Sequence, residues 1–572
     1  MKVVTRILVI IFFCVFSLTT HVSAQQIPSS AQSGIVARNL IIPPLVTETS
    51  QREAPLNLVK NSKPRLSMRE DKKVVLRKFE FLGNTIFSSF FLRMLLVEYL
   101  DETVSFKDLQ HATEIVEEYY KKRGYFLVRA ILPAQDITEG VIKIQILEGQ
   151  IGDLIIDGGK FYKKDFIEKH FIFSNTGRIN YQALLKSLIL LNEYSDLNVK
   201  LVLQKGKAPA TTDIVLKVQD KRPLHFTVDY NNFGSRYVSR NSTGVGLEYS
   251  NVLVGGDKIT AREVSGSPSR TLTYASVGYS LPINAYGTKV GASFEWSQYD
   301  VQREFRALDA GGRSQTVSVY LTHPLVRTLT SDADILVGFD AKDSRNYLLG
   351  SLDSVDKLRI FKIGLSGDRQ DDSLSGKNYF NMILSKGVAN TFGASEHNNP
   401  LASRQGAGGA LLKGNIDISR YQQLPLDSVI LLKAGMQVAD RVLPASEQWA
   451  IGGEQTVRGF PESEYLGDYG SVVNVEWNTP LPVWKYSRVP FTKQNLKDFF
   501  HIVGFWDYGN AYLKNPQGGD LKHAEISGAG FGFRLNFGHN LNALIDFGYP
   551  VSGEKPSTGK HEVTNVQVIK RF

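Results

Sequence analysis

The chain has 572 residues, of which 42% are hydrophobic and 11% aromatic, and its formal net charge is +9. This length allows several domains. The one cysteine, Cys14, lies in an apolar stretch that we expect to be removed, which excludes disulfides, thiolate metal sites and cysteine nucleophiles from the mature chain.

The first 24 residues have the pattern of a secretory signal peptide. Lys2 and Arg6 form a charged region, 7–18 form an apolar region, and Val22-Ser23-Ala24 supplies the small residues that signal peptidase requires. We therefore expect cleavage after Ala24. Beyond this point no stretch approaches the roughly 18 consecutive apolar residues of a transmembrane helix.

Residues 25–72 are predicted to be an N-terminal segment and linker. Its prolines interrupt any long helix: Pro43, Pro44, Pro55 and Pro64. Ser30 to Leu40 could form a short amphipathic helix, with Ile35, Val36 and Leu40 on its apolar side.

Residues 73–148 are predicted to form a compact α/β module. A strand over 74–81 precedes a helix over 88–99. A second helix starts after Ser105, with Asp108 in the N3 position of a cap, and ends at Gly124. Two predicted strands follow, one from Phe126 to Leu132 and one from Val141 to Leu147.

Residues 149–221 repeat the same order of elements. Ile151 to Ile156 is a predicted strand, and two helix-like segments and two more strands follow it: Asp165 to Phe171, Tyr181 to Glu193, Val199 to Leu203 and Ile214 to Val218. We therefore expect two tandem modules, each with a sheet edge that could accept another strand.

From 222 to 572 the pattern is one of alternating strands. In 473–478 one face is apolar and the other polar, and 542–549 repeats this alternation. A segment of this kind can span a membrane only as a closed barrel. At roughly 20 to 25 residues per strand and loop, about 14 to 16 strands fit. Composition alone also allows a soluble secreted protein, but the fold class favoured is mainly β, with a C-terminal transmembrane antiparallel barrel.

Several motifs resemble the transporters of two-partner secretion, the group of the haemolysin activators and the filamentous haemagglutinin transporter. They belong to the superfamily of outer-membrane barrels that carry POTRA domains. The first module is similar in Phe81-Leu82-Gly83-Asn84-Thr85, Tyr119-Tyr120-Lys121-Lys122-Arg123-Gly124-Tyr125, Leu132-Pro133-Ala134-Gln135-Asp136 and Leu147-Glu148-Gly149, and the second in Leu191-Asn192-Glu193. The barrel is similar in Asp229-Tyr230-Asn231-Asn232-Phe233-Gly234-Ser235, Tyr279-Ser280-Leu281-Pro282 and Gly452-Gly453-Glu454-Gln455-Thr456-Val457-Arg458-Gly459-Phe460.

The resemblance implies a bacterial outer-membrane transporter with periplasmic POTRA domains at 73–148 and 149–221. Such a protein exports one large exoprotein, recognised through its N-terminal secretion domain, without nucleotide hydrolysis. It implies contacts with outer-membrane lipid, the barrel assembly machinery and periplasmic chaperones, and no nucleic acid partner, cofactor, metal or enzymatic activity. The absence of Walker A and Gly-x-Ser-x-Gly motifs agrees with this expectation. Family members often have an N-terminal plug helix, and Ser30 to Leu40 occupies the corresponding place.

The resemblance also implies that the Val457-Arg458-Gly459-Phe460 loop folds into the lumen, where its arginine meets an aspartate on the wall. Strand parity indicates which aspartate this is. Phe505, Asp507 and Gly509 share one face of a predicted strand, and Trp506 and Tyr508 share the other. We expect Asp507 to point inward and pair with Arg458, whose fork geometry suits a carboxylate. The pair could gate the pore or only fasten the loop.

Two further sets of residues are candidates. Tyr119, Tyr120 and Tyr125 could contact the exoprotein, although aromatic residues at helical spacing are more often core. Phe572 ends the chain and resembles the terminal aromatic signal that is read during outer-membrane assembly. The main alternative is a factor that assembles other barrels, and a passive porin is a third class. The sequence leaves open whether the cargo is a cytolysin, an adhesin or an inhibitor.

Overall fold

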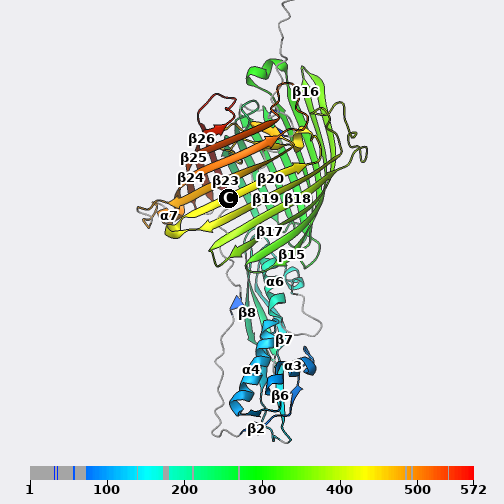
Figure 1. The fold of residues 1–572 in the computed structure, drawn as a ribbon, viewed down its shortest axis with the longest axis vertical. Coiled ribbons are helices and arrows are strands. Elements are labelled where there is room, and N and C mark those ends of the chain that lie inside the picture. Colours follow the sequence, from blue (N-terminus) through cyan, green and yellow to red (C-terminus); the bar gives the residue numbers. More distant parts are fainter. Residues whose placement is uncertain are drawn as a thin grey trace, which may run out of the picture.

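The computed structural model has two small α+β modules that lie beneath a large β-barrel (Figure 1). The residues that the structure describes are 31, 35–36, 56–57, 73–137, 139–171, 180–208, 211–267, 271–483, 486–490, 494–538 and 540–572. The expected signal peptide lies outside them.

The first module contains a three-stranded sheet in the order β3-β6-β5. The central strand β6 pairs parallel with β3 and antiparallel with β5. The elements are β2 (Val74–Val75), β3 (Lys78–Leu82), α3 (Ser89–Leu95), η2 (Val97–Tyr99), β4 (Thr103–Val104), α4 (Phe106–Lys122), β5 (Val128–Ile131) and β6 (Val141–Glu148).

Two predicted elements of this module are each divided in the structure. The strand expected over 74–81 separates into β2 and β3, because Leu76 exchanges backbone hydrogen bonds with 101–102. The helix expected over 88–99 ends at Leu95, because Leu96 has φ −113° and leaves the α conformation. A 3₁₀ turn then completes the segment.

The N-terminus of α4 is fixed by a capping box. The Ser105 hydroxyl accepts a hydrogen bond from the Asp108 amide, and the Asp108 carboxylate accepts one from the Ser105 amide. Two of the backbone donors at this end are thereby satisfied. The start of this helix is therefore encoded locally, as the sequence indicated.

The second module has the strand order β1-β8-β9-β7. Its elements are β7 (Gln150–Gly158), α5 (Lys164–Lys169), α6 (Tyr181–Asn192), β8 (Leu197–Lys205) and β9 (Thr211–Asp220). The additional strand β1 (Leu56–Asn57) comes from the linker and pairs parallel with β8, where Leu56 lies opposite Leu201. One edge of this sheet, at β8, thus accepts a strand from the chain's own linker.

Sixteen antiparallel strands close the barrel, which confirms the predicted fold class. They are β10 (Leu224–Asn231), β11 (Asn241–Ser250), β12 (Lys258–Ser267), β13 (Leu272–Pro282), β14 (Lys289–Asp300), β15 (Gly311–Arg327), β16 (Ser331–Leu348), β17 (Ser351–Asp371), β18 (Gly376–Gly387), β19 (Leu411–Gln423), β20 (Val429–Ala439), β23 (Tyr469–Pro480), β24 (Phe500–Tyr512), β25 (His523–Phe537), β26 (Leu541–Gly553) and β27 (Val563–Arg571). Short elements between them are η3 (Arg303–Leu308), η4 (Pro425–Asp427), η5 (Ala445–Glu447), β21 (Trp449–Ile451), β22 (Tyr465–Gly467) and α7 (Leu496–Phe499).

The barrel closes where β10 meets β27. Phe572 continues this pairing, since its amide donates to the Phe226 carbonyl at 2.8 Å. The Phe572 side chain is 65% exposed. The last residue therefore lies at the seam of the barrel with its ring outside the protein core.

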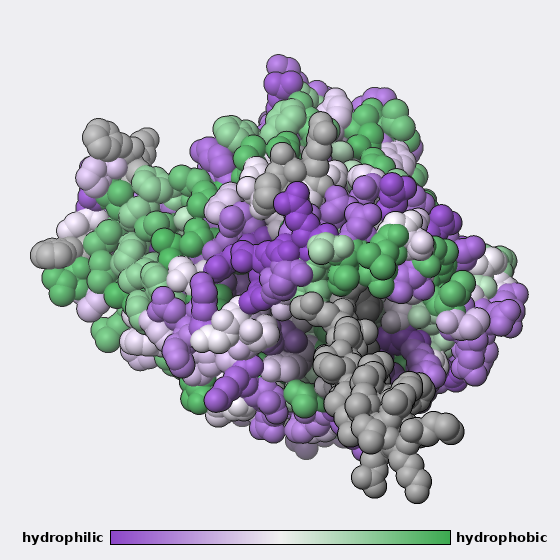
Figure 2. All heavy atoms as spheres, turned by 90° about the horizontal axis from the view of Figure 1, so that it is seen from above, coloured by the Kyte–Doolittle hydropathy of each residue, from purple (hydrophilic) through white to green (hydrophobic). Residues whose placement is uncertain are grey.

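The barrel wall alternates between an apolar outer face and a polar inner face. On β23, Val473 and Trp477 are exposed, whereas Asn474 is buried. In the view from above, hydrophobic residues gather on parts of the outer flank and hydrophilic residues across the middle of this end (Figure 2). This is the distribution of a barrel with lipid outside and water inside.

No helix among the described residues is both long and apolar enough to cross a membrane.

The second module docks against the turns at its end of the barrel. Glu193 accepts a hydrogen bond from Arg327 at 2.6 Å, and Asp196 pairs with His225 at 2.7 Å. The Asn251 side chain donates to the Phe161 carbonyl at 2.6 Å. These contacts connect the module to strands β10, β15 and the β11–β12 turn.

Candidate functional site in the barrel lumen

The loop that joins β20 to β23, residues 440–468, lies against the inner wall of the barrel. We call it the lumen loop. Val457 and Phe460 are fully buried. They pack in an apolar cluster with wall and loop residues, which are Ile451, Val472, Ala511, Ala524 and Ile526. Because both partners of these contacts are buried inside the barrel, the tip of the loop is packed as a protein core is packed.

Arg458 and Asp507 are brought together in this loop. The Arg458 Nε and Nη2 atoms donate to the two Asp507 carboxylate oxygens at 2.8 and 3.0 Å. The Arg458 backbone amide donates to the same carboxylate at 3.1 Å. Asp507 has no exposed surface, and the Arg458 side chain is 6% exposed. This is a buried bidentate ion pair, the strong form of such a contact.

Neighbouring side chains hold both partners in position. The Phe505 ring lies 3.6 Å from the Arg458 guanidinium carbon, a cation–π arrangement. The Asn474 amide donates to Asp507 at 2.8 Å. On β24, Trp506 is 43% exposed, so the alternation of this strand directs Phe505, Asp507 and Gly509 inward.

The cluster is larger than the sequence analysis anticipated. Arg458 Nη1 also donates to Glu476 at 2.7 Å and to Asp546 at 3.3 Å. Arg534, on β25, pairs with the same two carboxylates. Glu476 and Asp546 both fall on polar faces of predicted alternating strands, so strand parity was the signal that could have identified them.

Two glycines allow the loop to approach the wall. Gly459 has φ +97°, and a Cβ placed there would lie 2.7 Å from the Tyr549 carbonyl carbon. A Cβ on Gly509 would lie 2.8 Å from a Val457 methyl group. Larger residues at these positions would push the loop away from the barrel.

The three candidate tyrosines differ in burial. Tyr120 is fully buried, and its hydroxyl donates to Glu148 at 3.0 Å inside the module core. Tyr119 and Tyr125 are half-buried beside Phe87. Arg123 covers the Tyr119 ring at 3.7 Å. Tyr120 therefore serves the core, and its ring is not on the surface of the module.

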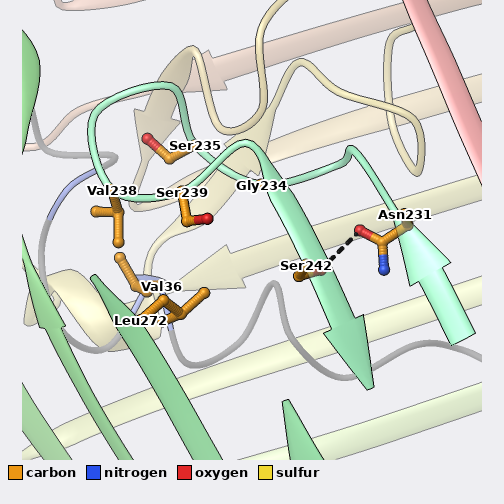
Figure 3. A pocket seen from close by; sticks show the side chains of 8 residues that line it. All are labelled: Val36, Asn231, Gly234, Ser235, Val238, Ser239, Ser242 and Leu272. Atoms are coloured by element: carbon orange, nitrogen blue, oxygen red, sulfur yellow. Dashed lines mark hydrogen bonds between the residues drawn. The ribbon is translucent and has the colours of Figure 1, made fainter. Parts of the chain in front are cut away.

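Only part of the expected plug helix lies within the described residues. Ala31, Ile35 and Val36 are buried, and Ala31 and Val36 belong to an apolar cluster inside the barrel. Val36 lines a small cavity beside Val238 and Leu272 (Figure 3). Ser242 and Asn231, also in its lining, are hydrogen-bonded at 3.1 Å.

The arrangement holds the lumen loop against the wall. Two guanidinium groups face three carboxylates, which satisfy one another through hydrogen bonds. Among the described residues, no group of three or more His, Cys, Asp or Glu side chains is placed to hold a metal ion.

A closed sixteen-stranded barrel, POTRA modules before it and a buried arginine loop define an outer-membrane transporter of the POTRA-barrel class. The chain belongs to the family described as haemolysin secretion/activation protein ShlB/FhaC/HecB, whose profile matches residues 210–535. The ShlB-type POTRA domain matches residues 74–149. The protein is therefore a transporter of two-partner secretion in the outer membrane, with its POTRA domains in the periplasm.

Three known proteins to which the chain is similar each share at most 24% sequence identity with it. The heme/hemopexin transporter protein HuxB of Haemophilus influenzae is 24% identical over 492 residues, which cover 84% of each chain. The solved CdiB from Escherichia coli matches with a TM-score of 0.73 and 20% identity, over 89% of this chain and 93% of that one. BamA from Haemophilus ducreyi, solved without POTRA domains 1–3, is less similar, with a TM-score of 0.51 and 12% identity over 88% of this chain and all of that one.

Proposed function

We propose that this transporter conducts its exoprotein through the barrel lumen, and that the lumen loop must move for the chain to pass. The observation that carries this proposal is the buried contact of Arg458 with Asp507 inside a closed barrel. A loop packed against the wall by charged hydrogen bonds occupies space that a passing polypeptide needs. The Arg458–Asp507 pair then stabilises the resting state, and this contact must break during each transport cycle.

The periplasmic modules are proposed to capture the exoprotein through its N-terminal secretion domain. In the first module β3 and β5 are the edge strands of the sheet, where an extended segment could add. The neighbouring α3 exposes large apolar side chains, namely Phe90, Phe91 and Met94, each more than half exposed. Such a surface suits an unfolded chain that is rich in apolar residues.

We also propose that Ser30 to Leu40 plugs the resting barrel. Support comes from Val36, which is buried among wall residues in the cavity of Figure 3. The corresponding division of the chain is a signal peptide at 1–24, a plug and linker at 25–72, POTRA domains at 73–148 and 149–221, and the barrel at 222–572. Phe572, at the seam, would be read by the barrel assembly machinery after delivery by periplasmic chaperones.

The lumen proposal is tested by secretion assays with Arg458→Ala, Asp507→Ala and the double variant at matched barrel abundance. We expect each single variant to reduce secretion and the double variant to resemble the singles, because the two side chains act as one unit. Normal secretion by all three would exclude both a gating and a positioning role. Lys362→Met is the matched control, since Lys362 pairs with Asp340 on the wall, away from Arg458.

Capture by the first module is tested separately. Deletion of 73–148, with barrel insertion verified, should abolish binding of the partner's secretion domain. Undiminished binding would contradict the proposed recognition role. Phe90→Ser and Phe91→Ser together should weaken binding without unfolding the module, because neither ring belongs to its buried core.

The identity of the cargo requires its own experiment. One relative is described as a heme/hemopexin transporter and another as the outer membrane transporter CdiB, so these descriptions do not name one common cargo. Comparing the proteins in the medium and on the cell surface of wild-type and deletion strains would identify it. Defective insertion of many unrelated barrels in that strain would instead favour an assembly factor.

A further inference from the structure

A second ion-pair cluster holds the opposite end of the lumen loop. Glu447, at the end of η5, is 5% exposed. It accepts a hydrogen bond from Lys342 at 2.5 Å and lies 2.6 Å from the Lys413 Nζ atom. Lys342 is on β16 and Lys413 on β19. One loop carboxylate therefore meets two wall cations.

The two clusters lie at separate places on the barrel wall. Glu447 meets Lys342 on β16 and Lys413 on β19, whereas Arg458 meets Glu476 on β23, Asp507 on β24 and Asp546 on β26. In the ring of strands, β16 and β19 precede β20, and β23 to β26 follow it. The lumen loop is thus attached to two different sets of wall strands.

Hydrogen bonds between side chains and the backbone support the Glu447 end of the loop. The side-chain amide of Gln437, which is buried on β20, donates to the Glu447 carbonyl at 3.0 Å and to the Asp468 carbonyl at 3.1 Å. The Ala445 amide donates to the Ser403 hydroxyl at 2.9 Å. This end is therefore connected to a wall strand and to the loop between β18 and β19.

A further buried pair joins the base of the lumen loop to the same neighbouring loop. Arg404 donates to both Asp468 carboxylate oxygens, at 2.5 and 3.3 Å, and Asp468 has no exposed surface. The Asp468 carboxylate also accepts from the Leu443 amide at 2.7 Å and the Lys514 amide at 2.6 Å. Asp468 thus joins segments from both ends of the lumen loop, so movement at Glu447 need not release the base.

We propose that Glu447, Lys342 and Lys413 form a second latch of the lumen loop, which must open independently of the Arg458 cluster before the lumen can widen. The proposal rests on the lumen being the route of export. A loop held at one place could swing aside when that contact opens, whereas a loop held at two places on the wall stays in the lumen until both contacts have opened. Glu447 is accordingly a positioning residue for transport, distinct from the Arg458 motif.

Hydrogen exchange on the purified full-length protein tests the latch directly. In Glu447→Gln, amides in 445–448 should exchange at least about tenfold faster, since their hydrogen bonds hold this end: Ala445 to Ser403, Glu447 to Pro444 and Gln448 to Ala445. Amides of 456–460 should change less than about twofold. Lys342→Met combined with Lys413→Met should reproduce this result, and adding Glu447→Gln to that pair should add little, because all three groups form one unit.

Channel recordings in planar bilayers then relate the latch to the lumen. Glu447→Gln should raise the open probability about tenfold, and combination with Arg458→Ala should raise it further, because the two contacts are released separately. Lys377→Met is the control for a change of wall charge, since Lys377 pairs with Asp368 and not with the latch, and it should match the wild type. Wild-type exchange and wild-type openings in a folded Glu447→Gln barrel would overturn the proposal, as would an equal effect of Lys377→Met. Faster exchange together with unchanged secretion in every lumen variant would contradict export through the lumen but would still support the latch contact.

Discussion

Replacing Arg458 by alanine should release the tip of the lumen loop. The substitution removes the two side-chain hydrogen bonds to Asp507 and the contacts with Glu476 and Asp546. Asp507, which has no exposed surface, keeps the Asn474 amide as a donor but loses its guanidinium partner. Breaking a buried pair by removing one partner typically costs about 3–5 kcal/mol.

This free-energy cost destabilises the state in which the loop is packed on the wall, because a released loop exposes its charges to water. At about 1.4 kcal/mol per factor of ten, the docking equilibrium should shift between roughly 10²- and 10⁴-fold toward release. Asp507→Asn should cost less, since it leaves no uncompensated charge on that residue. Adding Asp507→Asn to Arg458→Ala should restore part of the loss for the same reason.

Hydrogen exchange within 453–463 measures this shift. The Arg458 amide donates to Asp507, the Thr456 amide to the Gly453 carbonyl and the Ser463 amide to the Gly452 carbonyl. All three should lose protection in Arg458→Ala, while amides of β24 should keep theirs. Equal exchange of this segment in the wild type and in Arg458→Ala would refute the reasoning, because it would mean that apolar packing alone holds the loop.

Three further changes have defined expectations. Gly459→Ala should displace the lumen loop, because a φ of +97° costs an L-residue about 1–2 kcal/mol and the methyl group would clash with the Tyr549 backbone. Secretion at matched barrel abundance should therefore fall. Normal secretion would contradict the close approach of the loop to the wall. Ser105→Ala should destabilise the first module by about 1 kcal/mol through loss of its cap, measured by exchange of the first turn of α4, with no change in the second module. Burial lowers the pKa of His170, and nearby Lys289 adds to this effect, so the folded state disfavours the proton. The second module should keep its full stability above about pH 6.5 and lose stability as the pH falls below that value, because the unfolded chain then binds more protons. Hydrogen exchange of α6, corrected for intrinsic rates, measures this loss. Exchange that does not change with pH in this range would exclude the effect.

The sequence by itself determined features whose cause is local. Alternation of apolar and polar residues has the period of a strand, so it assigned the barrel and directed Asp507 inward from its neighbours Trp506 and Tyr508. The Ser105 and Asp108 capping box fixed the start of α4 within a few residues. The helices and strands of the two N-terminal modules could be predicted in the same way, since each has its own periodicity of apolar residues.

Only the tertiary structure decided which distant side chains meet. Glu476, Asp546 and Arg534 join Arg458 because the pairing of β23 through β26 brings inward-facing positions of these strands together, and no local pattern encodes that register. The pairing of β1 with β8 likewise depends on where the linker returns, not on the two residues that pair. The contacts of Glu447 with Lys342 and Lys413 also depend on the tertiary fold, because the three residues are far apart in the sequence.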